Sequence, residues 1–76
     1  MNYTIATMTD IHNDINIDFD KSGNMYMICL RNTESNELTY KKFANHADAV
    51  ELFNKLSTAI LTGCYSYEDR KAMFKA

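Results

Sequence analysis

The chain has 76 residues, a formal net charge of −2 and no proline or tryptophan, and a domain of this size buries only about 60% of its unfolded surface. A roomy catalytic pocket is therefore not expected, and we expect residues 1–76 to form one domain whose function lies on its surface. The longest apolar run, Met25 to Leu30, is far shorter than the roughly 20 residues of a membrane span, and the N-terminus lacks a secretion signal, which predicts a cytoplasmic protein.

The first 31 residues contain three candidate strands and a turn. Tyr3 to Thr9 is rich in β-branched residues but alternates poorly, so it is a weaker candidate for a strand. Asp14 to Asp20 alternates strictly between polar and apolar residues, which predicts a half-buried strand. Ser22 and Gly23 then predict a turn. Met25 to Arg31 has apolar residues at both odd and even positions, as in a strand covered on both faces, which predicts the central strand.

A hairpin with Ser22 and Gly23 at its tip sets which residues oppose one another. The expected pairs are Asp20 with Met25, Phe19 with Tyr26, Asp18 with Met27, Ile17 with Ile28, and Ile15 with Leu30. The isoleucines and Phe19 then face the core. The aspartates share the opposite face with Met25, Met27 and Cys29, and Asp14 lies near Arg31.

Asn32 to Glu37 predicts the next turn, and Leu38 to Phe43 predicts a further strand with Leu38 and Tyr40 facing the core. This strand completes an antiparallel meander.

A helix is predicted to begin after Asn45, an N-cap residue with Asp48 in the following turn, and to end at Gly63. Its apolar residues at helical spacing are Ala49, Val50, Leu52, Phe53, Leu56, Ala59 and Ile60. A three-stranded meander cannot bury its own apolar face, so this helix must cover one side of the sheet.

A second capping signal, Ser66 with Asp69, predicts a short C-terminal helix over Tyr67 to Ala76, docked by Met73 and Phe74. The expected fold is α+β: a three- or four-stranded antiparallel meander sheet packed on one face by an α-helix, plus this short helix.

The segment Asp18 to Asn24 contains part of a calcium loop. An EF-hand loop needs a bidentate glutamate at its twelfth position, where this chain has Cys29. Neither His12 nor His46 has a partner at metal-ligand spacing. We therefore expect a plain turn, and no metal or other cofactor.

Cys29 and Cys64 lack the CxxC spacing of redox motifs and the density of a disulfide scaffold, so we expect free thiols. Cys64 and His46 could form a nucleophile pair, but no third orienting group is identifiable. The sequence therefore predicts a protein that is not an enzyme.

The predicted outer side of the sheet is the best candidate for a contact surface. Residues two apart on a strand are separated by about 6.6 Å, so Asp14, Asp18 and Asp20 would form an acidic edge beside Met25 and Met27. Methionines adapt to a partner, and an apolar strip rimmed by carboxylates is typical of a protein-binding surface. The alternative is that the N-terminal segment or the last helix covers the two methionines.

The order of a short alternating strand, a glycine turn, two more strands and the helix ADAVELFNKLSTAI ending at a glycine resembles small phage-encoded anti-CRISPR proteins, both a type I-F inhibitor and the acidic type II-A inhibitor. The stretch AVELFNKLSTAILTGCYSYEDRKAMF is also similar in layout to the helical half of the type II-A protein. The resemblance covers most of the chain as a pattern of elements. It implies a stoichiometric inhibitor, in the cytoplasm of a bacterial host, that occludes a nucleic-acid-guided nuclease.

The resemblance further implies that carboxylates stand where phosphates would bind. It extends to the acidic positions Asp14, Asp18, Asp20, Glu34 and Glu37. This chain is much less acidic than the type II-A inhibitor, so binding through mixed polar and apolar contacts stays open beside phosphate mimicry.

Three functions are compatible with the sequence. The first is an inhibitor that binds a larger protein, such as a CRISPR effector, through the five acidic residues together with Met25 and Met27. The second is a homo-oligomeric module, such as a homodimer, that packs the methionine face on its own copy. The third is a nucleic-acid binder using Arg31, Tyr40, Lys41 and Lys42, which is disfavoured because no basic stripe is present and Asp14 is expected beside Arg31.

Overall fold

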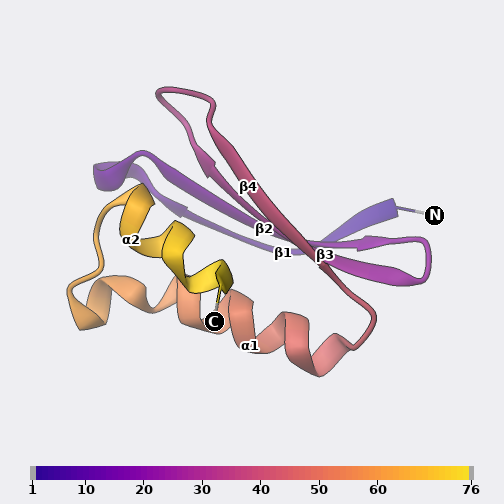
Figure 1. Ribbon diagram of the computed structural model, residues 1–76. Helices are drawn as coiled ribbons and strands as arrows, with labels where there is room; N and C mark the ends of the chain where they lie inside the picture. Colours follow the sequence, from indigo (N-terminus) through magenta and orange to yellow (C-terminus); the bar gives the residue numbers. More distant parts are fainter. Residues whose placement is uncertain (1, 76) are drawn as a thin grey trace.

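The computed structural model describes residues 2–75 as a four-stranded antiparallel sheet with all helices on one side (Figure 1). The strands lie in chain order: β1 (Asn2–Asp10), β2 (Ile15–Ser22), β3 (Met25–Asn32) and β4 (Leu38–Phe43). The helices are α1 (His46–Ser57) and α2 (Tyr67–Lys71), with 3₁₀ turns η1 (Ile11–Asn13), η2 (Ala59–Thr62) and η3 (Ala72–Lys75). The predicted α+β meander is confirmed, and its fourth strand is the N-terminal segment.

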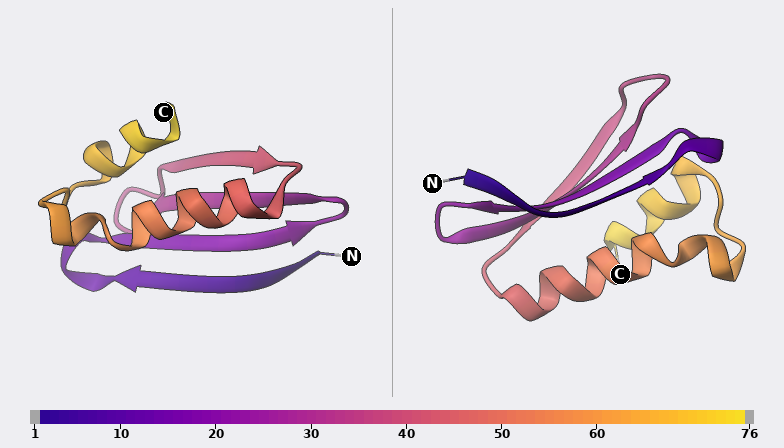
Figure 2. Two further views of the ribbon diagram at one scale, coloured as in Figure 1. Left: turned by 90° about the horizontal axis from the view of Figure 1, so that it is seen from below. Right: turned by 180° about the vertical axis from the view of Figure 1, so that it is seen from behind.

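The helices cover the sheet unequally. Figure 2 shows α1 lying over the middle of the sheet, roughly along the strands, while α2 and η3 lie toward β4. No helix within residues 2–75 has the length and apolar character to cross a bilayer. The C-terminal helix was predicted to reach Ala76, which lies outside the described residues.

The β2–β3 hairpin forms where it was predicted, but the predicted register is wrong by two residues. Ser22 opposes Met25, so the loop consists of Gly23 and Asn24 alone. Gly23 has φ +60°, which suits the first position of a two-residue hairpin loop and which few other residues adopt without strain. Because the shift is an even number of residues, every side chain keeps its predicted face.

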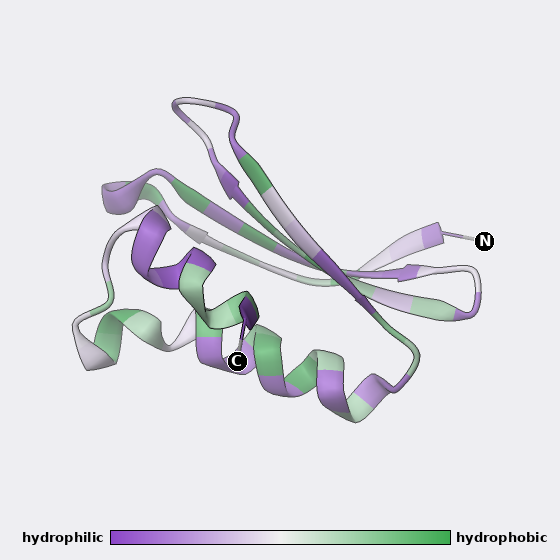
Figure 3. Cartoon of the chain, in the orientation of Figure 1, coloured by the Kyte–Doolittle hydropathy of each residue, from purple (hydrophilic) through white to green (hydrophobic). Residues whose placement is uncertain are grey.

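The core consists of the alternate residues of β2 and β3 that face α1. Ile15, Ile17, Ile28 and Leu30 are fully buried, and Phe19 is nearly so. Figure 3 shows the resulting alternation of hydrophilic and hydrophobic residues along β2.

The predicted orientation of β4 is wrong. Leu38 and Tyr40 oppose Arg31 and Cys29, so they point away from the helices and are more than half exposed. Thr39, opposite Leu30, takes the core side instead. Its hydroxyl lies 2.6 Å from that of Tyr67 on α2, which gives a polar side chain a partner at that position.

Strand β2 begins one residue later than predicted, because Asp14 ends the η1 turn. Asp14 has φ 56° and ψ 43°, a left-handed conformation that breaks the strand pattern. Its carbonyl accepts a hydrogen bond from the Thr33 N–H. Asn16, rather than Asp14, opposes Arg31 because of the register shift of two residues.

Helix α1 starts as predicted and ends earlier. The Asn45 side chain accepts a hydrogen bond from the Ala47 N–H at 2.8 Å, which satisfies a free donor of the first turn. The α-helix ends at Ser57, and η2 continues to Gly63, whose φ of 83° ends that turn. Ala49, Leu52, Leu56 and Ala59 are the buried residues of this segment.

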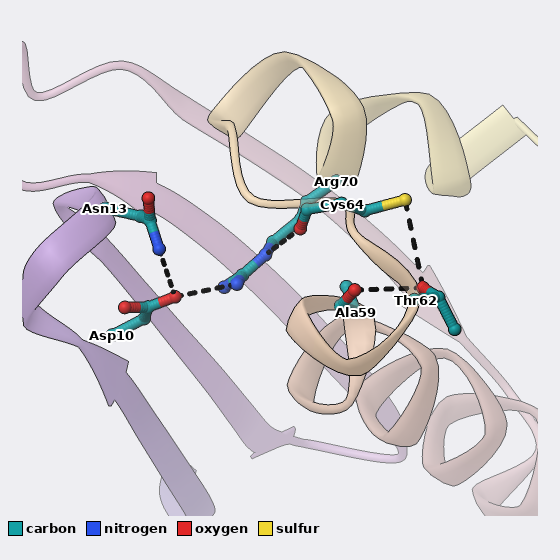
Figure 4. A network of polar contacts seen from close by, with 6 residues as sticks. All are labelled: Asp10, Asn13, Ala59, Thr62, Cys64 and Arg70. Carbon is teal, nitrogen blue, oxygen red and sulfur yellow. Dashed lines mark hydrogen bonds and ion pairs between the residues drawn. The ribbon is translucent and has the colours of Figure 1, made fainter.

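Helix α2 is anchored by a buried ion pair that the sequence did not reveal. The Ser66 hydroxyl caps the helix through the Asp69 N–H, as predicted. Arg70 is completely buried, and its Nη2 donates to Asp10 Oδ2 at 2.7 Å. Figure 4 shows that Asn13 donates to the same oxygen and that Arg70 Nε donates to the Cys64 carbonyl.

Removing one member of the buried pair should be far more damaging than removing both. Asp10→Asn should lower the free energy of unfolding by about 3–5 kcal/mol, because it leaves a buried guanidinium without its counter-charge. The double variant Asp10→Leu with Arg70→Met should recover most of this loss. Urea denaturation measures both, and Glu51→Ala is the control because it breaks an exposed pair with Lys55. A loss no larger than that of the control would contradict a structural role for the pair.

The same pair predicts acid sensitivity. The hydrogen bond from Asn13, followed by the interactions with Arg70, lowers the pKa of Asp10 below 3.8 although burial opposes this shift. The stabilisation that the pair provides is therefore complete above the pKa of Asp10 in the unfolded chain. It is lost as the pH falls through the lower pKa of Asp10 in the folded protein. Chemical unfolding measured from neutral pH to about pH 2 should show a steeper acid loss in the wild type than in the Asp10→Leu/Arg70→Met variant. If the free energy of unfolding fell equally with pH in both proteins, the pair would not be the source of the acid sensitivity.

Candidate functional site

The candidate site is the side of the sheet that points away from α1 and α2, which we call the outer face. No element of residues 2–75 covers this side (Figures 1 and 2). Strand alternation and the pairing registers place two sets of side chains on it. The polar set is Thr7, Thr9, Asn16, Asp18 and Asp20. The apolar set is Met25, Met27, Cys29, Leu38 and Tyr40.

The polar set is held by a chain of side-chain hydrogen bonds. Thr7 Oγ1 donates to Asp18 Oδ1 at 2.7 Å, and Asn16 Nδ2 donates to Asp18 Oδ2 at 3.1 Å. Thr9 Oγ1 donates to Asn16 Oδ1 at 2.9 Å. Both oxygens of Asp18 therefore already accept bonds within the protein, and the side chain is held in place.

Asp20 differs from Asp18 because its buried oxygen accepts no hydrogen bond. Its Oδ1 is shielded from solvent and has no hydrogen-bond partner in the described part of the chain. Asp20 opposes Thr4 on β1 and Met27 on β3. The carboxylate of Asp20 thus contains a buried acceptor without a donor, which a binding partner would reach only if neighbouring side chains moved.

The apolar set forms a shallow hollow beside the polar set. Met27, Cys29, Leu38, Tyr40 and Lys42 line a volume of about 300 Å³. Leu38 is 54% exposed and Tyr40 is 59% exposed, while Met27 and Cys29 are half-buried. Large apolar side chains gathered on one uncovered surface are typical of interaction sites.

Cys29 lies at the centre of the outer face and is not activated. Burial, followed by the carboxylates of Asp20 and Asp18, raises the pKa of the Cys29 thiol above 9.0. A thiol with a raised pKa contains little thiolate at neutral pH and is a poor nucleophile. Both Cys29 and Cys64 are free, as predicted.

The seven predicted contact residues are divided between several places. Asp18, Asp20, Met25 and Met27 share the outer face, whereas the other three do not lie on its strands. Asp14 is half-buried in the turn before β2, and Glu34 is exposed in the turn before β4. Glu37 reaches toward the helices, where its Oε2 accepts a hydrogen bond from Lys71 Nζ at 3.1 Å.

The structure does not bring together the two residues considered as a nucleophile pair. His46 is the first residue of α1 and packs against Phe19 and Tyr26. Cys64 follows η2, so the 12 residues of α1, about 18 Å of helix, separate the two residues along the chain. Within residues 2–75 no three His, Cys, Asp or Glu side chains form a group suited to a metal ion.

The residues of the nucleic-acid hypothesis are also divided. Arg31, Tyr40 and Lys42 are on the outer face, whereas Lys41 opposes Ile28 and faces the helix side. Two separated cations next to the carboxylates of β2 do not form the continuous basic surface that phosphate binding requires.

A larger depression of about 370 Å³ lies on the helix side, between β4, α1 and η3. Its floor includes Leu52 and Phe74, which belong to the buried core. Its rim carries both signs of charge, and two of these charges, Glu51 and Lys55, pair with each other at 3.4 Å. Its charged groups therefore do not converge on one point where a ligand would be held.

Sequence reasoning missed the residues that hold the two ends of the fold together, Asp10 and Arg70. The available signal was the spacing of Tyr67, Arg70 and Phe74, which places an arginine on the buried stripe of the last helix. A charge on such a stripe implies a buried partner, although the sequence does not identify that partner.

Comparisons with models of known protein families, with curated proteins and with solved structures gave no match to this chain.

The raised pKa of Cys29 can be tested by thiol labelling. In a Cys64→Ser background, Asp20→Asn should increase the rate of alkylation by iodoacetamide by about twofold or more at mildly alkaline pH, because removing the carboxylate increases the thiolate fraction. Glu34→Gln, which removes a carboxylate from the turn before β4, is the matched control. Equal rates in all three proteins would show that the acidic residues do not influence Cys29.

Proposed function

We propose that this protein is a small inhibitor that binds a larger protein and covers part of its surface through the outer face. The observation that supports this most directly is the apolar hollow around Leu38 and Tyr40, which lies on a side of the sheet that the helices leave uncovered. Aromatic side chains that are exposed in the free protein and become buried on binding contribute strongly to protein interfaces.

The arrangement of the outer face favours binding over catalysis. Its one thiol has a raised pKa, and its best-ordered carboxylate, Asp18, is occupied by internal hydrogen bonds. Tyr40 and Leu38 supply apolar contact. The protein therefore acts by stoichiometric binding, without turnover.

The target follows from the resemblance to small anti-CRISPR proteins. On this proposal the protein acts in the cytoplasm of a bacterial host, as a product of a phage or mobile element, and occludes a nucleic-acid-guided nuclease. The predominance of apolar over acidic side chains on the outer face supports contact with a protein surface more than imitation of a phosphate chain. Only Asp18 and Asp20 of the five acidic positions lie on this face.

The proposal is tested by DNA cleavage assays with purified type I-F and type II-A guided nucleases. Wild-type protein should abolish cleavage by one of them at a fixed molar ratio. The double variant Leu38→Ala with Tyr40→Ala should weaken this inhibition about tenfold or more, because it removes the central apolar contacts.

Glu51→Ala, on the exposed side of α1, is the matched control and should inhibit like the wild type. Thermal unfolding of each variant separates loss of binding from loss of fold. Cleavage that continues at full rate with either nuclease in the presence of excess protein would refute the proposed target. Inhibition unchanged in the Leu38/Tyr40 variant would refute the proposed surface.

A further inference from the structure

Strand β1 forms one edge of the sheet, and its outer side has no partner in residues 2–75. β1 pairs with β2 alone, and Figure 2 shows no other segment alongside it. The strand has nine residues, so it presents a long row of backbone donors and acceptors. Such an edge is a template for pairing with another strand.

The hairpin register identifies which residues of β1 point outward. Ser22 and Met25 close a two-residue loop, so they form a hydrogen-bonded pair, and every second residue of β2 from Ser22 bonds to β3. The residues between them, such as Ile17, bond to β1. Met8 opposes Ile17 and is thus bonded within the sheet, whereas the neighbouring Thr7 directs its N–H and C=O away from the sheet.

The two edges of the sheet differ in how they resist pairing. β4 carries Lys41 and Lys42, and lysines on an edge strand discourage association. β1 has no charged residue and no proline from Asn2 to Thr9. Its one irregularity is the bulge at Ile5, which leaves the segment from Ala6 onward regular.

We propose that two copies of this protein pair through β1 in antiparallel orientation, with a two-fold axis beside Thr7. Thr7 is the outward-directed residue nearest the middle of the strand, so this register pairs Ala6 to Met8 directly and places the bulge at Ile5 opposite Thr9 of the second copy. Each Thr7 would exchange both backbone hydrogen bonds with Thr7 of the second copy. Ala6 would lie opposite the second Met8, so the side chains on the core side meet others of the same kind.

A second copy is the occupant that the two edges favour. A strand without charge meets no like-charge repulsion from its own copy, and two-fold pairing satisfies both free edges at once. The remaining edges of the joined sheet are the two β4 strands with their lysines, so association stops at two copies. A two-fold axis perpendicular to the sheet also keeps both outer faces on the same side.

Sedimentation velocity of the full chain, over a series from about 1 µM to about 1 mM, tests this proposal. The wild type should show a dimer that increases with concentration. Thr7→Lys should weaken dimerisation about tenfold or more, because it sets two like charges opposite each other. Tyr40→Lys, on the outer face of β4, is the matched control and should dimerise like the wild type.

Cross-linking gives a second measurement that does not depend on how well the lysine variant folds. Hydrogen-bonded antiparallel pairs have a Cα–Cα distance of about 5.5 Å, which suits a disulfide. In a Cys29→Ser/Cys64→Ser background, Thr7→Cys should therefore form a linked dimer on mild oxidation, and Tyr40→Cys should not.

A wild type that stays monomeric at all concentrations would overturn the proposal. A dimer that Tyr40→Lys abolishes and Thr7→Lys preserves would also overturn it, because the contact would then be the outer face. These results are independent of the cleavage assays, since a monomer can inhibit a nuclease and a dimer can fail to do so.

Discussion

A single layer of helices covers one side of a four-stranded sheet. This arrangement determines which side chains are buried and which are left on the uncovered side. The apolar stripe of α1 is matched to the alternate residues of β2 and β3, and burial of each such side chain is worth roughly 1.5–3 kcal/mol. Residues 2–75 contain no second apolar helix for the other side. Side chains on the outer face are therefore not required by the core, which is why Leu38 and Tyr40 can remain exposed there.

The buried pair between Asp10 and Arg70 addresses a different problem, the attachment of a short helix. α2 has five residues, too few to be stable by itself. The guanidinium bonds to both the end of β1 and the Cys64 carbonyl, so it fixes the connection after η2 as well as the helix. Its Nη1 has no partner in residues 2–75. Replacing a buried ion pair by apolar residues is often neutral or stabilising, whereas removing one partner alone is strongly destabilising.

Much of the fold was predictable because local signals agree with the tertiary structure. Asn45 and Ser66 cap the helices that they were predicted to cap, and the alternation of β2 identified its buried face correctly. The failures occurred where a face depends on contacts distant in sequence. Leu38 and Tyr40 are apolar and were assigned to the core, but Tyr67, 28 residues after Thr39, provides the partner that allows Thr39 to take that position.

The candidate site was predicted in part for the same reason. The alternation of residues in the sequence specifies which side chains of β2 and β3 share a face. A register error of two residues does not change that face, so the predicted placement of Asp18, Asp20, Met25 and Met27 was correct. Asp14 and Glu37 lie at turns, where a left-handed residue or a cross-fold ion pair decides the direction of a side chain. Such contacts leave no periodic signal in a sequence.

The separation of 60 residues between Asp10 and Arg70 also has a consequence for biosynthesis. At roughly 5–20 residues per second, a ribosome needs about 3–12 s to add Arg70 after Asp10. During that interval the Asp10 carboxylate is exposed to water, and the β2–β3 hairpin can form long before the final attachment of α2. Completion of the native state therefore awaits synthesis of the last helix, and the nascent chain passes through a stage in which its sheet has formed while the end of β1 is still unsecured.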